Sequence, residues 1–179
     1  PLPLGSSLNK KTVGIVGMGR IGQAIAHRCA AFGMKIVYQG PRKKENVSYE
    51  YQPDVQKLAE VSDFLILACP GGAETHHLVH EPILEALGPK GFLINISRGS
   101  VVDEESLIIA LQERKIAGAG LDVYQNEPHV RAEFVKMDNV VLLPHIGSAT
   151  VETRAAMGEL VVRNLLAHFN GEPLLTPVL

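Results

Sequence analysis

The chain has no tryptophan, only two cysteines and no excess of positive charge. Cys29 and Cys69 lie in apolar segments without the spacing of a zinc or redox site, so we expect reduced core thiols in a cytoplasmic protein. The formal net charge of −2 argues against a nucleic-acid surface, which normally carries a basic excess. No apolar run approaches the length of a membrane span. We therefore expect neither nucleic acid nor a membrane among the partners.

The most informative stretch runs from Thr12 to Gly22. A β-branched apolar run ends in Gly17-x-Gly19-x-x-Gly22, and a helical pattern begins at once, which is the context in which this motif indicates dinucleotide binding. Gly17 permits a tight turn, Gly19 lets the backbone approach a pyrophosphate, and Gly22 lets the helix pack closely on the strand. The positive end of that helix would receive the phosphates.

Alternation of strands and helices predicts a doubly wound α/β fold, with a mostly parallel sheet of the Rossmann type in three αβα layers. After the first strand, which ends at Gly17, the apolar runs predict strands at 35–39, 47–51, 63–69, 91–96, 117–123 and 140–143. The helices are expected at 20–32, 53–60, 103–114 and 151–169. At 179 residues the chain suits one large domain.

Apolar spacing predicts one stripe on the first helix and one on the last. The first comprises Ile21, Ala24, Ile25, Arg28, Cys29 and Phe32. The second comprises Ala155, Leu160, Val161, Leu165 and Phe169, and we expect it to be core rather than interface. The charged stretch from Arg131 to Asp138 is expected to be an exposed connector.

The end of the second strand indicates which cofactor binds. A Rossmann domain normally places an acid there to hold the ribose hydroxyls, but this chain has Gly40 and no carboxylate before Glu45. Arg42 and Lys43 could pair with a 2′-phosphate. The alternative is that these bases are merely solvated in a surface turn. The missing acid favours NADP(H), with NAD(H) possible.

Three further segments carry candidate chemistry at the ends of predicted strands, where ligands bind in open α/β sheets. Arg98 offers a fork for a carboxylate and a carbonyl oxygen, and His145 could donate a proton to that oxygen as hydride arrives. A nearby Glu127 would raise the pKa of such a histidine. Each residue also has a structural interpretation. Arg98 could cap a helix or join an ion pair, His145 could be a loop histidine, and Glu127 could be a turn residue.

These motifs resemble the nucleotide-binding domain of the D-isomer-specific 2-hydroxyacid dehydrogenases, most of all the glyoxylate/hydroxypyruvate reductase branch. The matching segments are 12–22, 95–103, 118–128 and 144–154. The resemblance implies that Arg98 binds substrate, that Glu127 pairs with the proton donor His145, and that Asp122 holds the nicotinamide carboxamide. Together, motif and resemblance give these cofactor-binding residues: Gly17, Gly19, Arg20, Ile21, Gly40, Arg42, Lys43, Cys69, Pro70, Thr75, Ile96, Ser97, Arg98, Asp122, His145, Gly147 and Ser148.

The resemblance also implies an NADP-dependent oxidoreductase that reduces a small 2-ketoacid, such as glyoxylate or hydroxypyruvate, to the D-2-hydroxyacid. Family members have two domains and dimerise largely through the nucleotide-binding domain, so we expect a homodimer in which some exposed apolar surface could belong to the partner subunit. On this basis residues 1–11 are a linker from a substrate domain that is missing here, 12–170 are the dinucleotide-binding domain, and 171–179 lead back toward the substrate domain. We expect the chain alone to be poorly active or inactive.

Two alternatives to this enzyme stay open. One is an NAD(P)H-sensing or corepressor-like module without turnover, and the other is a different Rossmann enzyme such as a homocysteine-hydrolase-like domain. The histidines at 76, 77 and 80 could suggest a metal site, but no thiolate or carboxylate accompanies them, and we expect no metal.

Overall fold

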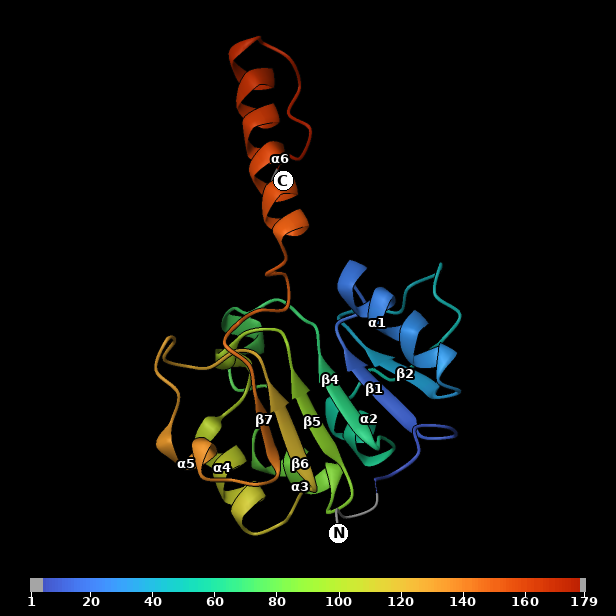
Figure 1. The fold of residues 1–179 in the computed structure, drawn as a ribbon. Helices are drawn as coiled ribbons and strands as arrows, with labels where there is room; N and C mark the ends of the chain where they lie inside the picture. The colour runs from blue at the N-terminus through green and yellow to red at the C-terminus, as the bar shows by residue number, and fades with distance from the viewer. Residues whose placement is uncertain (1–4, 178–179) are drawn as a thin grey trace. The chain divides into compact units, whose positions relative to one another are not determined.

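Parallel strands form one sheet in the order β3-β2-β1-β4-β5-β6-β7 in the computed structural model, which describes residues 5–177. All strand pairs are parallel, so the carboxyl ends lie along one edge of the sheet, where the arrows point in Figure 1. The strands are β1 Thr12–Val16, β2 Lys35–Gln39, β3 Glu50–Tyr51, β4 Phe64–Leu67, β5 Phe92–Asn95, β6 Gly118–Leu121 and β7 Val140–Leu142.

Helices connect the strands. They are α1 Arg20–Ala31, α2 Val55–Glu60, α3 Glu81–Leu87, α4 Glu104–Gln112, α5 Ala132–Val135 and α6 Val151–Phe169, with short 3₁₀ turns η1 Ala73–Thr75 and η2 Gly99–Val101. The predicted strands and helices are all confirmed, with shorter bounds for most. α3 and α5 were not predicted, because each is short.

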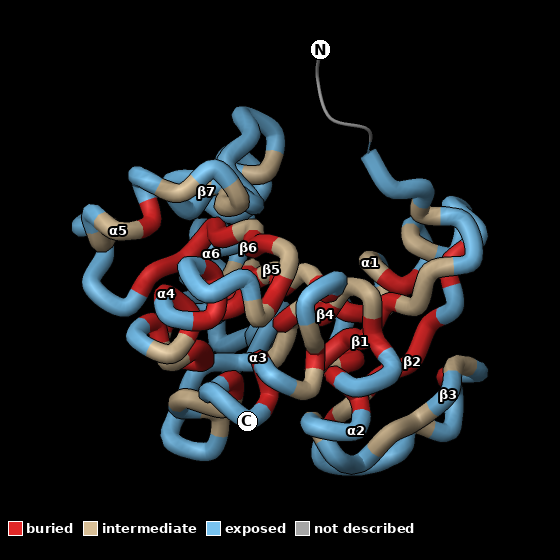
Figure 2. Tube along the Cα trace, turned by 90° about the horizontal axis from the view of Figure 1, so that it is seen from below, coloured by how far each residue is buried: buried red, intermediate tan, exposed pale blue. Residues whose placement is uncertain are grey.

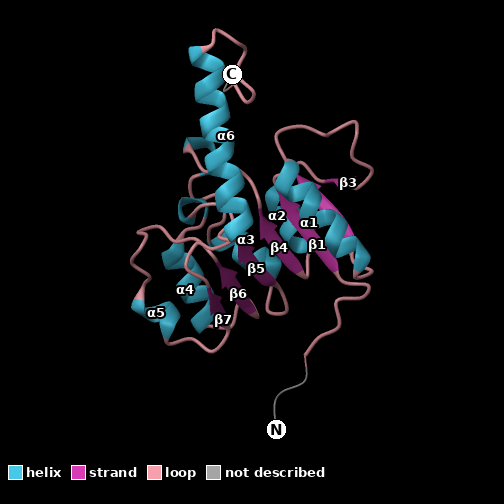
Figure 3. Cartoon of the chain, turned by 45° about the horizontal axis from the view of Figure 1, so that its top comes forward, coloured by secondary structure: helices cyan, strands magenta, loops and turns pink. Residues whose placement is uncertain are grey.

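Two apolar cores lie on the two faces of the sheet. One joins α2, α3 and α4 to strand residues such as Leu65 and Leu67, and the other joins α1 to Val13 and Ile15. Successive strand residues contribute to opposite faces because side chains alternate along a strand. Figure 2 shows the buried residues concentrated along the strands, and Figure 3 shows the strands side by side from β1 through β4, β5 and β6 to β7. The predicted three-layer α/β fold is therefore confirmed.

The predicted stripe on α1 is wrong in part. Ile21 and Phe32 are 60% and 62% exposed, whereas the buried residues of the helix are Gly22 and Ala26. The two buried residues are small because the helix lies directly against the end of the first strand at Gly22. Ile25 and Cys29, which the stripe did include, pack against this core.

The stretch from Arg131 to Asp138 is more than an exposed connector. It contains α5, and the Phe134 side chain is fully buried in the first core. Arg131 pairs with Glu105 and Glu133 at 2.8 and 3.0 Å, so charged groups surround a buried aromatic anchor.

The chain divides into two compact units between Pro144 and His145. The second unit contains α6, whose bounds match the prediction and whose N-cap Thr150 accepts a hydrogen bond from the Thr153 N–H. Within this unit the predicted apolar stripe forms no core, since all five of its side chains are exposed. No helix among residues 5–177 combines the length and apolar character that crossing a bilayer requires.

Candidate functional site

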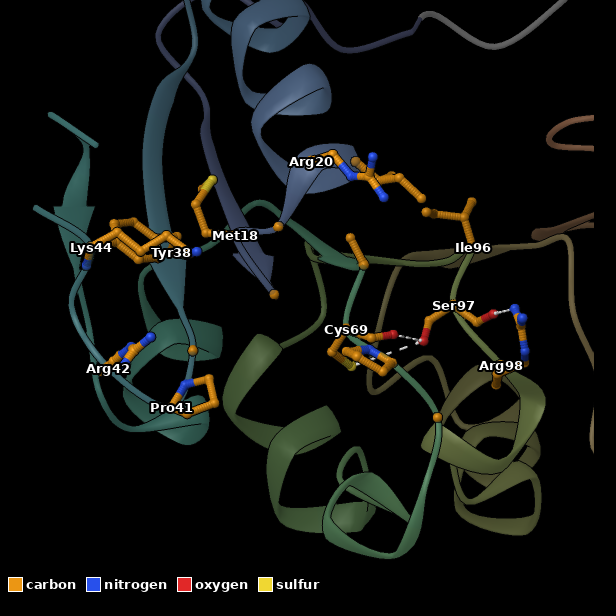
Figure 4. Close-up of a pocket in the computed structure, with 17 residues that line it drawn as sticks. Met18, Arg20, Tyr38, Pro41, Arg42, Lys44, Cys69, Ile96, Ser97 and Arg98 are labelled. Atoms are coloured by element: carbon orange, nitrogen blue, oxygen red, sulfur yellow. Dashed lines mark hydrogen bonds between the residues drawn. The ribbon is translucent and has the colours of Figure 1, made fainter. Parts of the chain in front are cut away.

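A cavity of about 830 Å³ lies at the carboxyl ends of four adjacent strands (Figure 4). The strand order places it where the chain changes direction: β2 and β3 lie on one side of β1, and β4 begins the other side. Such a switch point is the usual ligand site of an open parallel sheet. The lining residues are Gly17, Met18, Gly19, Arg20, Ile21, Tyr38, Gly40, Pro41, Arg42, Lys44, Ala68, Cys69, Pro70, Gly71, Ile96, Ser97 and Arg98.

The glycine turn after β1 contains two kinds of glycine. Gly17 has φ +94°, and a Cβ there would lie 2.6 Å from the Cys69 backbone nitrogen. A Cβ at Gly22 would collide with the Gly17 carbonyl oxygen. Gly19 differs, because its φ is −76° and a Cβ would meet no atom within 4 Å. The fold requires Gly17 and Gly22, whereas Gly19 only keeps the cavity open for whatever binds there.

The N-terminus of α1 faces this turn. Gly19 is its N-cap and supplies no side-chain hydrogen bond, and the first turn has no acidic residue. The first N–H groups of a helix lack intrahelical acceptors and carry partial positive charge. This helix end therefore suits an anionic ligand.

All charged side chains that line the cavity are cationic, although the chain as a whole has a net charge of −2. They are Arg20, Arg42, Lys44 and Arg98, and Figure 4 shows Arg42 and Lys44 on the β2 side with Arg98 on the opposite side. Lys43 is exposed and is not among the lining residues. The basic turn thus brings Arg42 and Lys44 to the site, and Lys44 was missed because a sequence does not give the direction of loop side chains.

A second cavity of about 490 Å³ adjoins the first and shares Gly17, Gly40 and Cys69 with it. Thr75 lines it, and the Thr75 hydroxyl donates to the Pro70 carbonyl oxygen at 2.7 Å, which fixes the turn after β4. The Ser97 hydroxyl donates to the Cys69 carbonyl oxygen. Burial raises the pKa of the Cys69 thiol, so we assign it a packing role rather than that of a nucleophile.

Arg98 is held at the end of β5 by a buried asparagine. The Asn95 side-chain amide donates to the Arg98 carbonyl oxygen at 3.0 Å, and its oxygen accepts the Ser97 N–H at 3.0 Å. The absence of a side chain at Gly71 makes room for the stem of Arg98, whose Cγ would lie 2.7 Å from a Cβ there. The Arg98 Nη1 donates to the Ser97 carbonyl oxygen at 2.6 Å. The guanidinium is exposed and stands at the cavity.

Glu127 lies in the loop after β6, which the neighbouring segments hold in place. Its Oε1 accepts the Tyr124 N–H at 3.1 Å. The Glu104 carboxylate, 5% exposed, accepts the next N–H, that of Gln125, at 2.8 Å. A Cβ at Gly99 would collide with the Tyr124 carbonyl group, so the segment after Arg98 packs directly on this loop. Sequence reasoning missed Glu104, because nothing in its pattern distinguishes a buried carboxylate from a solvated first-turn acid.

Asp122, His145, Gly147 and Ser148 complete the set of predicted site residues. Asp122 is buried at 5% exposure directly after β6. His145 is exposed, has φ +55° and opens the second unit, which also contains Gly147 and Ser148. The pairing of Glu127 with His145 therefore stays a prediction.

The three histidines near residue 80 contact neighbouring groups of the chain. The rings of His76 and His77 stack at 3.9 Å, and the His77 Nε2 accepts from the Gln125 side-chain amide at 2.8 Å. The His80 Nδ1 contacts the Leu78 carbonyl oxygen at 3.3 Å. Within residues 5–177, no group of three or more His, Cys, Asp or Glu side chains is arranged to hold a metal ion.

Comparison with known proteins gives one consistent family. The family model described as D-isomer specific 2-hydroxyacid dehydrogenase, NAD binding domain, matches residues 2–147. The chain is 54% identical over 175 residues to glyoxylate/hydroxypyruvate reductase A HPR2 of Arabidopsis thaliana, covering 98% of this chain and 56% of that protein. It is 51% identical over 177 residues to 2-ketogluconate reductase of Gluconobacter oxydans, covering 99% and 57%.

A solved structure is similar throughout. The NADPH-dependent glyoxylate/hydroxypyruvate reductase of Sinorhizobium meliloti, in complex with NADP and malonate, matches with a TM-score of 0.95 and 50% identity. The match covers 99% of this chain and 56% of that one. The chain thus spans about half the length of the relatives it matches.

Proposed function

This chain belongs to the D-isomer specific 2-hydroxyacid dehydrogenases and contains their NAD-binding domain, and on that premise we propose that it is the cofactor-binding part of an NADPH-dependent 2-ketoacid reductase. The whole protein would reduce a small 2-ketoacid, such as glyoxylate or hydroxypyruvate, to the D-2-hydroxyacid. The observation that carries the proposal is the cationic cavity at the switch point of the sheet. At its edge, Gly19 leaves the N-terminus of α1 accessible, with no atom within 4 Å of where a Cβ would lie.

Preference for NADP(H) rests on the end of β2. Among residues 5–177 no carboxylate lines this cavity, and Arg42 and Lys44 supply positive charge that would attract a 2′-phosphate. The carboxylate of Glu74 lines the adjoining cavity. Lys43 is retained as an outer contributor on charge alone. The relative from Sinorhizobium meliloti, described as NADPH-dependent, supports the same preference. NAD(H) remains a usable cofactor in this proposal, because the remaining contacts do not involve the 2′ position.

The other proposed cofactor contacts follow the strand ends. Gly17, Gly19, Arg20 and Ile21 would hold the pyrophosphate at the start of α1. The adenosine and nicotinamide portions would lie along residues that line the two cavities, namely Gly40, Cys69, Pro70, Thr75, Ile96 and Ser97. Asp122, His145, Gly147 and Ser148 are assigned to the nicotinamide end by family resemblance.

The proposed chemistry needs three side chains. When bound, NADPH supplies the hydride that reduces the keto carbon. Arg98 would bind the substrate carboxylate and carbonyl oxygen and stabilise the charge that develops on that oxygen. His145 would donate a proton to the same oxygen, and Glu127 would favour the protonated imidazole. If Glu127 has this role, E127Q in the full-length enzyme shifts the pH optimum downward; an unchanged pH profile contradicts it.

We also propose a homodimer and a cytoplasmic location. β7 is an edge strand in which Val141 is 64% exposed, and Leu143 directly after it is 44% exposed; apolar edges of this kind are usually covered. Both cysteines are free thiols, in keeping with a reducing compartment. Sedimentation equilibrium of the chain tests the dimer, and V141K should shift it toward monomer.

The decisive experiment has two parts. Fluorescence titration of the 179-residue chain with NADPH and NADH should show tighter NADPH binding, and R42A should selectively weaken NADPH. With the full-length protein, loss of NADPH absorbance is followed in the presence of glyoxylate or hydroxypyruvate. Binding without consumption of NADPH by any 2-ketoacid would overturn the reductase in favour of a sensing module.

A further inference from the structure

The loop that follows β2 is held by two tyrosine hydroxyl groups. The Tyr51 hydroxyl donates to the Gly40 carbonyl oxygen at 2.9 Å, at the start of the loop. The Tyr38 hydroxyl accepts the Lys44 backbone N–H at 2.9 Å, at its end. Pro41, Arg42 and Lys43 lie between these two anchors. The part of the loop that carries Arg42 is therefore fixed on both sides.

The two tyrosines form one rigid element. Tyr38 and Tyr51 are directly opposite each other in the β2–β3 pairing, and their ring centroids are 5.3 Å apart at an interplanar angle of 51°. Tyr38 has no exposed surface. Packing of this kind leaves the hydroxyl groups little freedom, so the two hydrogen bonds define where the loop backbone lies.

The start of the loop is also tied to the glycine turn, because the Gly17 N–H donates to the Gln39 carbonyl oxygen at 2.9 Å. The two tyrosine hydroxyl groups, called the clamp below, thus fix Arg42 and Lys44 relative to the proposed pyrophosphate site. Both cations line the cavity. The two tyrosine hydroxyl groups bond to Gly40 and Lys44 and not to the turn after β1, so their removal should leave the proposed pyrophosphate site in place.

We propose that Tyr38 and Tyr51 are positioning residues for cofactor selectivity: they hold the Gly40–Lys44 loop in the conformation that presents Arg42 and Lys44 to a 2′-phosphate. This inference rests on the proposed NADP(H) preference. A purely structural role predicts equal losses for both nucleotides. A positioning role predicts a loss confined to the nucleotide that carries the 2′-phosphate.

The test measures dissociation constants for NADPH and NADH with the 179-residue chain and its Y38F and Y51F variants. Phenylalanine keeps the ring packing and removes one hydrogen bond. Each variant should weaken NADPH binding measurably and by at most about tenfold, because the free energy of one protein hydrogen bond limits how far the loop equilibrium can shift. The NADH constant should stay within about twofold. Y51F is the safer variant if Y38F unfolds, because Tyr51 is only partly buried.

Tyr49 provides a matched control. It packs against the same core, but its hydroxyl group makes no hydrogen bond to residues 40–44 in the described part of the chain. Y49F should leave the NADPH to NADH ratio unchanged. If both clamp variants leave the ratio unchanged while the parent chain prefers NADPH, the clamp is overturned and the proposed function stands. If the parent chain binds neither nucleotide, the proposed function itself fails.

Discussion

Replacing Gly19 by alanine should separate folding from cofactor binding. The Gly19 backbone, at φ −76° and ψ −163°, is extended and open to any residue, and an added Cβ meets no atom of the chain within 4 Å. Alanine is a poorer N-cap than glycine by about 0.5–1 kcal/mol. Alanine also lowers the conformational entropy of the unfolded chain, which raises the free energy of unfolding by about 0.4–1 kcal/mol. The free energy of unfolding should therefore stay nearly constant.

Binding should respond very differently. The methyl group would stand at the helix N-terminus where a pyrophosphate must approach the backbone. Loss of one hydrogen bond from an N–H to a charged oxygen costs about 1.5–3 kcal/mol, which corresponds to about a 10- to 150-fold weaker affinity. NADPH and NADH should weaken alike, because both contain the pyrophosphate. Fluorescence titration beside a urea unfolding curve measures both effects.

Gly158 supplies the matched control. It lies inside α6, and a Cβ there also meets nothing within 4 Å. G158A should raise stability by about 0.5–1 kcal/mol, since alanine is the better helix former, and leave affinity unchanged. If G19A binds NADPH as tightly as the parent chain, the assignment of this turn to the pyrophosphate is refuted.

Cofactor choice, loop support, acid stability and turnover can each be tested by one measurement. G40D should reverse the preference toward NADH, since a Cβ at Gly40 meets only the Arg42 carbonyl oxygen at 4.0 Å and a carboxylate there repels a 2′-phosphate; unchanged selectivity in titrations contradicts it. E104A should lower the free energy of unfolding by about 1–3 kcal/mol by stranding the Gln125 N–H, with a smaller loss for E104Q in urea melts. The hydrogen bond from the Ser106 hydroxyl holds the pKa of the Asp103 carboxyl below its ordinary value. The ionised carboxylate therefore stabilises the folded protein at pH values above its unfolded pKa of about 4, and this stabilisation is lost as the pH falls through the lower pKa of the folded state. D103N should make the free energy of unfolding decline less steeply below about pH 4, and an equally steep decline contradicts this. The 179-residue chain should bind NADPH yet reduce glyoxylate poorly, and turnover typical of an intact reductase would contradict the proposal that this chain is only the cofactor-binding part.

The sequence predicted those features that depend on local backbone demands. Gly17 and Gly22 could be assigned because a left-handed turn and a close helix contact tolerate no side chain, and the structure shows both. The buried strands were also predictable, because a short continuous apolar run is typical of a strand that is covered on both faces of a parallel sheet. α6 was predicted with correct bounds from its apolar spacing.

Other features depend on how segments meet in space. The choice between Lys43 and Lys44 depends on loop direction, which the Tyr38 and Tyr51 hydroxyl groups determine from outside the loop. The α1 stripe failed because close packing selects the small Gly22 and Ala26 over the larger Ile21. Periodicity finds apolar residues, but it does not reveal which of them a ligand will cover.

Arg98 and Glu127, the two proposed catalytic side chains of the first unit, lie on segments that pack against each other. Arg98 directly precedes Gly99, whose missing side chain lets the backbone at Tyr124 lie against it, and Glu127 in turn bonds the Tyr124 N–H. Glu104 holds the same loop from α4. A change at the start of α4 would therefore move the Glu127 loop and press on the Arg98 segment without touching either side chain. The distance between these two side chains is thus a property of backbone packing around η2, and substitutions there should alter catalysis before they alter binding of the pyrophosphate, which depends on the separate turn after β1.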